Sequence, residues 1–212
     1  MKAYLRKEIT DYKAWVLDMD GTLYYQLPVR ICMAFELLFY YLFRPNKISD
    51  LVSVYKYRKK NEKGELQKQD VNITVWMQKK PKKYVRFFRD RKLIKQAQTM
   101  QRRGVKTVVY SDYPLTEKLE ALSPFQPDFA FSAGDAEIQC LKPDNKGLLH
   151  IVKVLNLPVE DIVFIGDRLE KDAACAQKTG MDYLVLNRIF FIRNKIYKKM
   201  VKSVFGGRIS DT

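Results

Sequence analysis

The stretch AWVLDMDGT, residues 14–22, decides the fold of this chain. A short apolar run of strand length leads directly into Asp18 and Asp20, which are separated by a single residue. In an extended chain alternate side chains share a face, so both carboxylates point the same way. Two carboxylates this close do not both ionise cheaply without a nearby cation. The stretch therefore predicts a buried strand that ends in a cation-binding site.

Further apolar runs of strand length recur along the chain, and they are nearly continuous rather than alternating. They are VKTVVY at 105–110, IVFIG at 162–166, YLVL at 183–186 and a weaker DFAFS at 128–132. Helical patterns separate the later runs, at 115–122, 145–156 and 169–180. Continuous apolar runs are typical of parallel strands covered on both faces. Because strands and helices alternate, we predict an α/β fold with a doubly wound parallel sheet.

The connection after the first strand is much longer than one crossover helix requires, because the next strong run begins only at residue 105. Its residues favour helices at 29–43, about 47–60 and 81–103. The run ICMAFELLFYYLF at 31–43 contains Glu36 and is too short to span a bilayer, so we expect a buried helix. An all-helical insertion after the first strand is the simplest account of this region.

The sequence thus divides into a core and an inserted subdomain. We predict a catalytic core of residues 1–26 and 100–212, and a helical subdomain at 27–99. The core ends in a basic segment, 187–212, whose apolar residues recur on one helical face. Basic amphipathic helices of this kind either lie on an anionic membrane surface or dock on their own domain or a partner chain. The sequence leaves peripheral membrane contact open.

Polar residues follow the other predicted strands, at the edge of the sheet where ligands bind in open α/β folds. They are Ser111 and Asp112 after VKTVVY, Lys142 in LKPD, and Asp167 with Asp172 in GDRLEKD. Taken alone, Ser111 could be a turn residue at a strand end, and Lys142 a solvated loop lysine. Together with Asp18 and Asp20, however, they are expected to converge on one crevice. Carboxylate oxygens are the ligands that Mg²⁺ prefers, so Mg²⁺ is the cation we expect there.

Four motifs in order, DMDGT, the serine of YSD, the lysine of LKPD, and GDRLEKD, resemble those of the haloacid dehalogenase (HAD) superfamily of phosphohydrolases. The resemblance covers residues 14–186. It implies a Rossmann-like, three-layer α/β/α core with an all-helical cap inserted after the first strand. Asp20 favours a phosphatase or phosphomutase, because the dehalogenase branch lacks a second aspartate there and the transport ATPases carry threonine.

The resemblance also implies a role for each motif residue. Asp18 would attack phosphorus and form an aspartyl-phosphate, while Asp20 would protonate the leaving group and then deprotonate the attacking water. Ser111 and Lys142 would bind the phosphoryl oxygens. The residues implied as Mg²⁺ ligands are Asp18, Asp167 and the backbone carbonyl of Asp20.

Two further residues near these motifs have less direct roles. Asp172 would support Lys142 or act indirectly on the site. Asp112 follows Ser111 where the family more often has a small or amide residue, and we group it with the substrate-binding residues.

The charge and composition limit the remaining functions. The net charge is +15, and residues 56–103 carry 17 Lys and Arg against 4 Asp and Glu, which suits an anionic substrate or a solvated helix face. No nucleic-acid-binding module is recognisable, so nucleic acid is not an expected partner. His150 is the only histidine, which excludes chemistry built on several histidines. The three cysteines have neither metal-ligand nor disulfide-like spacing, and no secretion signal is recognisable, so we expect a cytoplasmic protein.

The combined prediction is a Mg²⁺-dependent phosphatase that hydrolyses the phosphate monoester of a small phosphorylated metabolite. A phosphomutase of the same superfamily is one alternative. A membrane- or RNA-associated binding protein is another, although such a protein has no need of Asp18, Asp20 and Lys142 together. The oligomeric state and the identity of the substrate are not encoded in any of these motifs.

Overall fold

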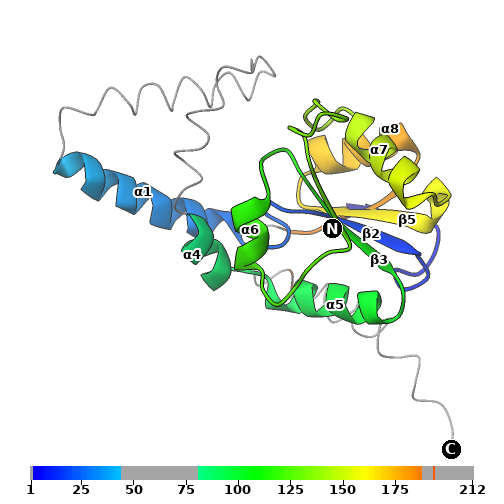
Figure 1. Cartoon of the computed structure of the whole chain (residues 1–212), viewed down its shortest axis with the longest axis horizontal. Helices are drawn as coiled ribbons and strands as arrows, with labels where there is room; N and C mark the ends of the chain where they lie inside the picture. Colours follow the sequence, from blue (N-terminus) through cyan, green and yellow to red (C-terminus); the bar gives the residue numbers. More distant parts are fainter. Residues whose placement is uncertain (1, 44–80, 188–192, 194–212) are drawn as a thin grey trace, which may run out of the picture.

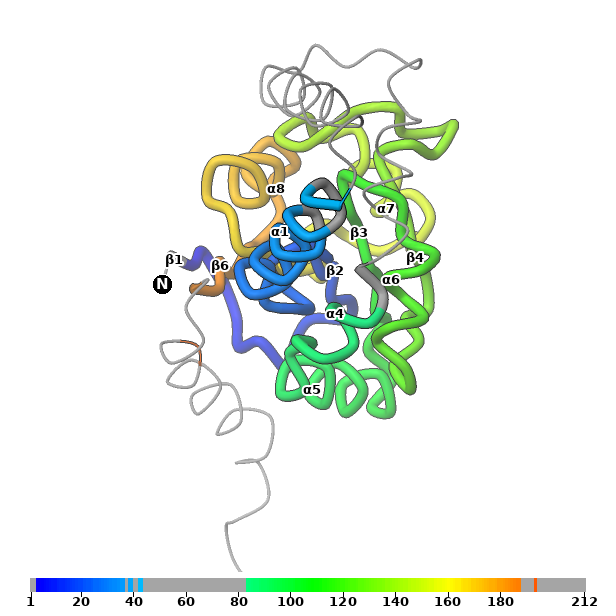
Figure 2. The backbone as a smooth tube through the Cα atoms, turned by 90° about the vertical axis from the view of Figure 1, so that its left-hand side faces the viewer, coloured from blue at the N-terminus to red at the C-terminus, as the bar shows by residue number. Residues whose placement is uncertain are grey.

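The computed structural model describes residues 2–43, 81–187 and 193 (Figure 1). Their centre is a six-stranded sheet in the order β1-β6-β5-β2-β3-β4. The strands are β1 (Lys2–Tyr4), β2 (Ala14–Asp18), β3 (Lys106–Ser111), β4 (Phe129–Ser132), β5 (Ile162–Gly166) and β6 (Asp182–Val185). Neighbouring strands are parallel except for β1, which pairs with β6 in the antiparallel sense. Figure 2 shows β1 and β6 at one edge of the sheet and β4 at the other.

The register of the central strands places their carboxyl ends side by side. Along β2, Asp18 lies opposite Tyr110 of β3, and Leu17 lies opposite Ile165 of β5. The residues that follow these three parallel strands therefore leave the sheet at the same edge. Because β2 lies between β5 and β3, the chain crosses over on both sides of it, which is where doubly wound folds bind ligands.

Helices cover both faces of the sheet (Figure 1). They are α1 (Gln26–Leu42), α4 (Pro81–Phe87), α5 (Arg91–Arg102), α6 (Thr116–Ala121), α7 (Lys146–Leu155) and α8 (Ala174–Thr179). Two short helical turns, η3 (Val159–Asp161) and η4 (Leu169–Ala173), flank β5.

The side chains of β2 alternate between two cores, and this creates the three layers. Trp15 and Leu17 belong to the apolar cluster that includes Leu93 and Ala97 of α5. Val16 belongs to the opposite cluster, which includes Leu148 of α7 and residues of α8. All five β2 residues are buried, as expected for a strand with helices on both faces. The predicted α/β class with a largely parallel sheet is confirmed.

The helix predicted at 81–103 is two helices, and the break has a clear cause. Asp90 caps α5, since its side chain accepts a hydrogen bond from the backbone N–H of Leu93 at 3.1 Å. The backbone N–H of Asp90 donates to the carbonyl of Leu23 at 2.8 Å, and that of Tyr25 donates to Phe88 at 3.0 Å. These long-range bonds hold residues 88–90 against the segment that leaves β2, where Arg89 forms an antiparallel bridge with Tyr24.

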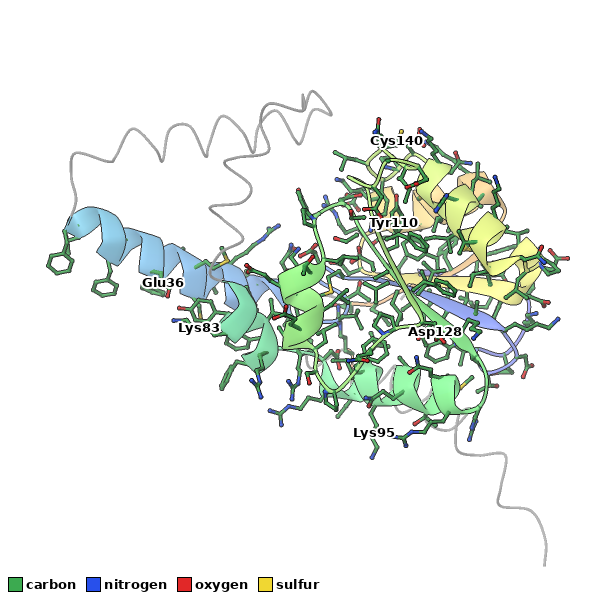
Figure 3. The ribbon with its side chains drawn as sticks, in the orientation of Figure 1. Glu36, Lys83, Lys95, Tyr110, Asp128 and Cys140 are labelled. Atoms are coloured by element: carbon green, nitrogen blue, oxygen red, sulfur yellow. The ribbon has the colours of Figure 1, made fainter. Side chains whose placement is uncertain are left out.

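The helix predicted at 29–43 is present as α1, but the expectation that its apolar side chains are buried is wrong. Phe35, Leu38 and Phe39 are each more than half exposed. The reason is that α1 projects away from the sheet and only its first turns reach the core (Figure 1). Glu36 of α1 pairs with Lys83 of α4 at 3.0 Å, and Figure 3 labels the two close together.

The remaining predictions concern the N-terminal strand, the segment beyond α1, the basic tail and the division into core and cap. The three-residue strand β1 was not predicted, because KAY is too short to give a pattern. The predicted helix at 47–60 and nearly all of the basic tail lie outside the described residues. The division into core and cap stays a prediction, although α5 shares the core cluster with β2. None of the described helices is long and apolar enough to cross a membrane.

Candidate active site

Asp18, the last residue of β2, has its two carboxylate oxygens in different environments. Oδ1 accepts a hydrogen bond from Nζ of Lys142, which lies 2.8 Å from Asp172 Oδ1 as well. Oδ2 is buried and has no hydrogen-bond partner among the described residues. The carboxylate is thus oriented through one oxygen, and the other is left available for chemistry at the strand end.

Lys142 lies in the loop after β4 and is itself almost completely buried. Its ammonium group lies 5.3 Å from the ring centroid of Tyr110 and 5.5 Å from that of Phe164. Figure 3 labels Tyr110 within the layered core. Two aromatic faces and two carboxylates therefore surround this cation, which compensates for the water it has lost.

Asp112 fixes the loop that carries Lys142. Asp112 Oδ1 accepts a hydrogen bond from the backbone N–H of Lys142 at 2.9 Å, and Oδ2 lies 3.3 Å from Nζ of Lys171 in η4. One side chain at the end of β3 thus connects the loop after β4 with the turn after β5. Both oxygens of Asp112 thus contact protein groups in this structure. Its contact with substrate stays a prediction.

Asp167 and Asp172 follow β5 and approach Asp18. One carboxylate oxygen of each of the three lies within 4.8 Å of the others. Asp172 Oδ2 accepts hydrogen bonds from the backbone N–H groups of Asp167 at 3.1 Å and Arg168 at 2.9 Å. A Cβ at Gly166 would lie 2.5 Å from the Asp172 side chain, so only glycine fits there. Asp172 therefore shapes this turn and holds Lys142, which suits a supporting residue.

Asp20 is held by a lysine that sequence reasoning missed. Nζ of Lys118, from α6, lies 2.7 and 2.8 Å from the two oxygens of Asp20. The hydroxyl of Tyr24 donates to Oδ1, and that of Ser111 donates to Oδ2 at 3.1 Å. Ser111 is fully buried, and its Oγ also accepts from the backbone N–H of Tyr113 at 3.1 Å. Both oxygens of Asp20 therefore have fixed partners.

A signal for Lys118 was present in the sequence. In LTEKLEAL it lies three residues after Leu115 and four before Leu122, both of which are buried. Residues three and four apart share one face of a helix. A lysine within an apolar stripe must find a buried partner or reach solvent, so its position predicts a buried charge.

The burial and charge of this site shift the pKa values of the two carboxyls in opposite directions. Burial raises the pKa of Asp18 well above its usual range, Lys142 opposes this, and the neighbouring carboxylates add to it. Burial also acts to raise the pKa of Asp20, but Lys118 and the hydroxyls of Tyr24 and Ser111 outweigh it and lower the value. Asp18 is thus the group that most requires additional positive charge.

Four acidic side chains gather at these strand ends: Asp18, Asp20, Asp167 and Asp172. The ion pairs made by Lys118 and Lys142 offset two of their four formal negative charges. A divalent cation would offset the other two. A group of buried carboxylate oxygens that includes an unpartnered one fits a hard cation such as Mg²⁺.

The loop after β2 is shaped so that it passes close to Asp167. Gly21 has φ of +98°, which favours glycine, and a Cβ at this position would lie 2.4 Å from Asp167 Oδ2. The sequence-predicted residues at the ends of β2, β3 and β5 and in the Lys142 loop are thus brought together at one edge of the sheet. Asp20 stands slightly apart from the three-carboxylate group, and its predicted contribution to a metal is its backbone carbonyl.

The family model of haloacid dehalogenase-like hydrolases matches residues 12–180, and the chain belongs to this family. The resemblance predicted from the four motifs is confirmed. No protein of curated function matches the chain by sequence.

Solved structures match the fold over most of the chain. A HAD phosphatase from Thermococcus onnurineus has a TM-score of 0.62 at 18% identity, covering 92% of this chain and 99% of that chain. YfnB from Bacillus subtilis, a HAD hydrolase bound to magnesium, has a TM-score of 0.61 at 15% identity, with the same coverage of 92% and 99%. CbbY from Rhodobacter sphaeroides, in complex with xylulose bisphosphate, has a TM-score of 0.60 at 18% identity, covering 86% and 89%.

Proposed function

We propose that this protein is a Mg²⁺-dependent phosphatase that hydrolyses a phosphate monoester through an aspartyl-phosphate on Asp18. The observation that carries the proposal is the environment of Asp18, whose Oδ1 is held by Lys142 while its buried Oδ2 has no partner among the described residues. A nucleophilic carboxylate needs this arrangement, since one oxygen must be oriented and the other must reach phosphorus.

Lys142 has two tasks in this proposal. It fixes the rotamer of Asp18, and it places a positive charge beside the oxygens of the transferring phosphoryl group, where transfer is mainly an electrostatic problem. Bound Mg²⁺, held by Asp18, Asp167 and the backbone carbonyl of Asp20, would neutralise further charge on the phosphoryl oxygens. Asp172 holds the ammonium group of Lys142, and Asp112 holds its backbone N–H.

Asp20 relays protons in both halves of the proposed reaction. Its neighbours lower the pKa of Asp20, so it would take up a proton as the negatively charged phosphate binds beside it. Asp20 then gives this proton to the leaving alcohol and later takes one from the water that attacks the aspartyl-phosphate. Lys118, Tyr24 and Ser111 hold its carboxylate beside the end of β2. Once substrate is bound, the hydroxyl of Ser111 would turn from Asp20 and donate its hydrogen bond to a phosphoryl oxygen instead.

A small phosphorylated metabolite is the proposed substrate class. The structural relative CbbY was solved with xylulose bisphosphate, a phosphorylated sugar. The dense positive charge of residues 56–103 also suits an anionic ligand. We place the protein in the cytoplasm because Cys32, Cys140 and Cys175 are all free thiols.

The test is release of inorganic phosphate from p-nitrophenyl phosphate and from a panel of phosphorylated metabolites, with Mg²⁺ or with EDTA. We expect Mg²⁺-dependent release by the wild type and none by Asp18→Asn, which keeps the shape of the side chain but removes its nucleophilic oxygen. A folded, Mg²⁺-binding wild type that releases no phosphate from any compound would refute a general phosphatase. Equal rates for wild type and Asp18→Asn would refute the covalent mechanism.

A further inference from the structure

Arg193 is a fully buried arginine that the sequence gives no reason to connect with the active site. Its guanidinium donates to the backbone carbonyls of Thr22, at 3.0 Å, and Gly21. It also donates to Asp90 Oδ2 at 3.2 Å, and its Nε donates to the carbonyl of Asn187. A buried arginine is tolerated only when its N–H groups are paired in this way.

Two of the three carbonyls that Arg193 contacts, those of Gly21 and Thr22, belong to the loop that carries the proposed chemistry. Gly21 directly follows Asp20, and its φ of +98° sets the plane of the Asp20–Gly21 peptide. This peptide holds the backbone carbonyl proposed as a Mg²⁺ ligand. Backbone carbonyls buried away from water need a donor. Arg193 supplies donors to the two carbonyls that follow this proposed ligand in the loop, those of Gly21 and Thr22.

The same guanidinium also contacts Tyr25, in the segment that leaves the sheet, and Asp90, in the segment that returns to it. Asp90 Oδ2 accepts from the hydroxyl of Tyr25 at 2.8 Å as well as from Arg193, and the Tyr25 ring lies 5.1 Å from Arg193 Cζ. The backbone of Asp90 is bonded to Leu23 at 2.8 Å. Arg193 therefore joins residues 21–25, on the way to α1, with residue 90, at the start of α5.

We propose that Arg193 is a positioning residue for phosphoryl transfer. It fixes the loop of Asp20, Gly21 and Thr22 by donating to the carbonyls of Gly21 and Thr22, and it anchors this loop to Asp90. This inference rests on the proposed function, because it assigns Arg193 a role in that reaction. A residue beyond the matched family region, 12–180, would then set the geometry of the first motif. Displacement of a reacting group by about 1 Å can cost about 10²-fold in rate.

The test compares the full-length wild type with Arg193→Ala, Arg193→Lys and the control Arg103→Ala, which removes an exposed arginine at the end of α5. Deuterium uptake by residues 19–25 is measured by mass spectrometry, together with thermal unfolding. The kcat and KM for p-nitrophenyl phosphate with Mg²⁺ are then determined, with and without methylguanidinium.

We expect Arg193→Ala to exchange faster at residues 19–25 and to lose about 10- to 100-fold in kcat, with KM little changed. Methylguanidinium should fill the vacated space and restore part of kcat in this variant alone. Arg193→Lys keeps one charge but reaches fewer acceptors, so we expect an intermediate loss without rescue. It provides the comparison if the alanine variant does not fold.

Unchanged exchange at residues 19–25 in both folded Arg193 variants would overturn the proposal. So would a loss of activity that only follows the folded fraction and does not respond to methylguanidinium. A wild type that releases no phosphate would instead refute the proposed function. In that case the exchange data still decide whether Arg193 holds this loop.

Discussion

Two buried lysines, Lys142 and Lys118, pair with the two carboxylates at the end of β2, and the two ion pairs differ in geometry. Lys142 contacts one oxygen of Asp18 and shares its charge with Asp172, so the other Asp18 oxygen keeps no partner among the described residues. Lys118 contacts both oxygens of Asp20. The first arrangement leaves one oxygen of the proposed nucleophile without a partner among these residues, and the second fixes a side chain in place. The same ion-pair chemistry thus produces two carboxylates with different surroundings, which suits the two different roles we propose.

The supports of the two lysines also differ. Lys142 has two aromatic rings beside it and a loop that is fixed by Asp112. Lys118 lies on α6, a helix of six residues, with the ring of Tyr113 at 5.4 Å. We therefore expect the Lys142 side of the site to be the more sensitive to substitution.

The largest effect is expected for Lys142→Met. Removal of this cation leaves Asp18 without its orienting partner. It also removes the positive charge beside the phosphoryl oxygens, so kcat should fall by about 10²- to 10³-fold. Asp18 and Asp172 would then be buried without their cation, which should lower the free energy of unfolding by about 3–5 kcal/mol. Phosphate release and denaturant unfolding measure the two effects, with Lys146→Met, at an exposed position of α7, as the control. Nearly full activity would remove Lys142 from the mechanism.

A smaller loss is expected for Lys118→Met. Tyr24 and Ser111 still contact Asp20 in this variant, so kcat should fall by about 10-fold, a fraction of the 10²- to 10⁴-fold typical of acid–base groups. Steady-state kinetics with p-nitrophenyl phosphate measure it, and Lys153→Met on the exposed side of α7 is the matched control. A loss as large as that of Lys142→Met would show that the two lysines are equivalent and that our comparison is wrong.

Asp112→Asn should have a modest effect on the Lys142 side. The amide oxygen can still accept from the backbone N–H of Lys142, but the ion pair with Lys171 is lost. A partly exposed pair of this kind contributes little, so kcat/KM should fall by about 2- to 5-fold. If Asp112 bound substrate directly, KM would rise much more than kcat falls, and a panel of substrates would show it.

The smallest effect on activity is expected far from both lysines, at Asp128, which Figure 3 labels near the start of β3. Burial acts to raise its pKa, but the N–H and hydroxyl of Thr107, with Gln101 and Lys106, lower the value below its usual range. Because the folded state favours the carboxylate, its stabilising contribution is present above the unfolded pKa. The contribution disappears as the pH falls through the folded pKa.

Asp128→Asn should therefore lower the free energy of unfolding by about 1 kcal/mol at pH 7 and by progressively less below about pH 4. Urea titrations across this range measure the difference, while kcat should be unchanged. A difference that grew in acid would contradict the sign of the pKa shift. A change in kcat would show that the two ends of β3 are coupled.

Those parts of the fold and the site that depend on local pattern could be predicted from the sequence. The continuous apolar runs of β2, β3 and β5 end in Asp18, Ser111 and Asp167, and parallel strands place such ends together. The family and the α/β class followed from these runs and their motifs.

The parts that could not be predicted depend on contacts between distant segments. Arg193 is one of 39 basic residues, and only its packing decides that it is buried. The apolar neighbours of Lys118 signal its burial, but the packing of α6 decides that its partner is Asp20. The break between α4 and α5 arises from backbone bonds to residues 23–25. The exposure of α1 follows from the direction in which it leaves the core, which no periodicity encodes.

The pairing of β1 with β6 has a consequence for the order of events during synthesis. Ala3 lies opposite Leu184, and Asp182 of β6 is fully buried by contacts with Arg6 and Tyr12. Residues 2–12 are therefore translated long before their partner strand exists, and this part of the sheet cannot close until β6 has left the ribosome. When β6 emerges, β1 has already been synthesised and can pair with its exposed edge at once. An open edge that could pair with another nascent chain is therefore short-lived. Ribosome-bound chains that end before residue 182 should accordingly show less protection of the β1 segment, residues 2–4, from hydrogen exchange than the full chain does.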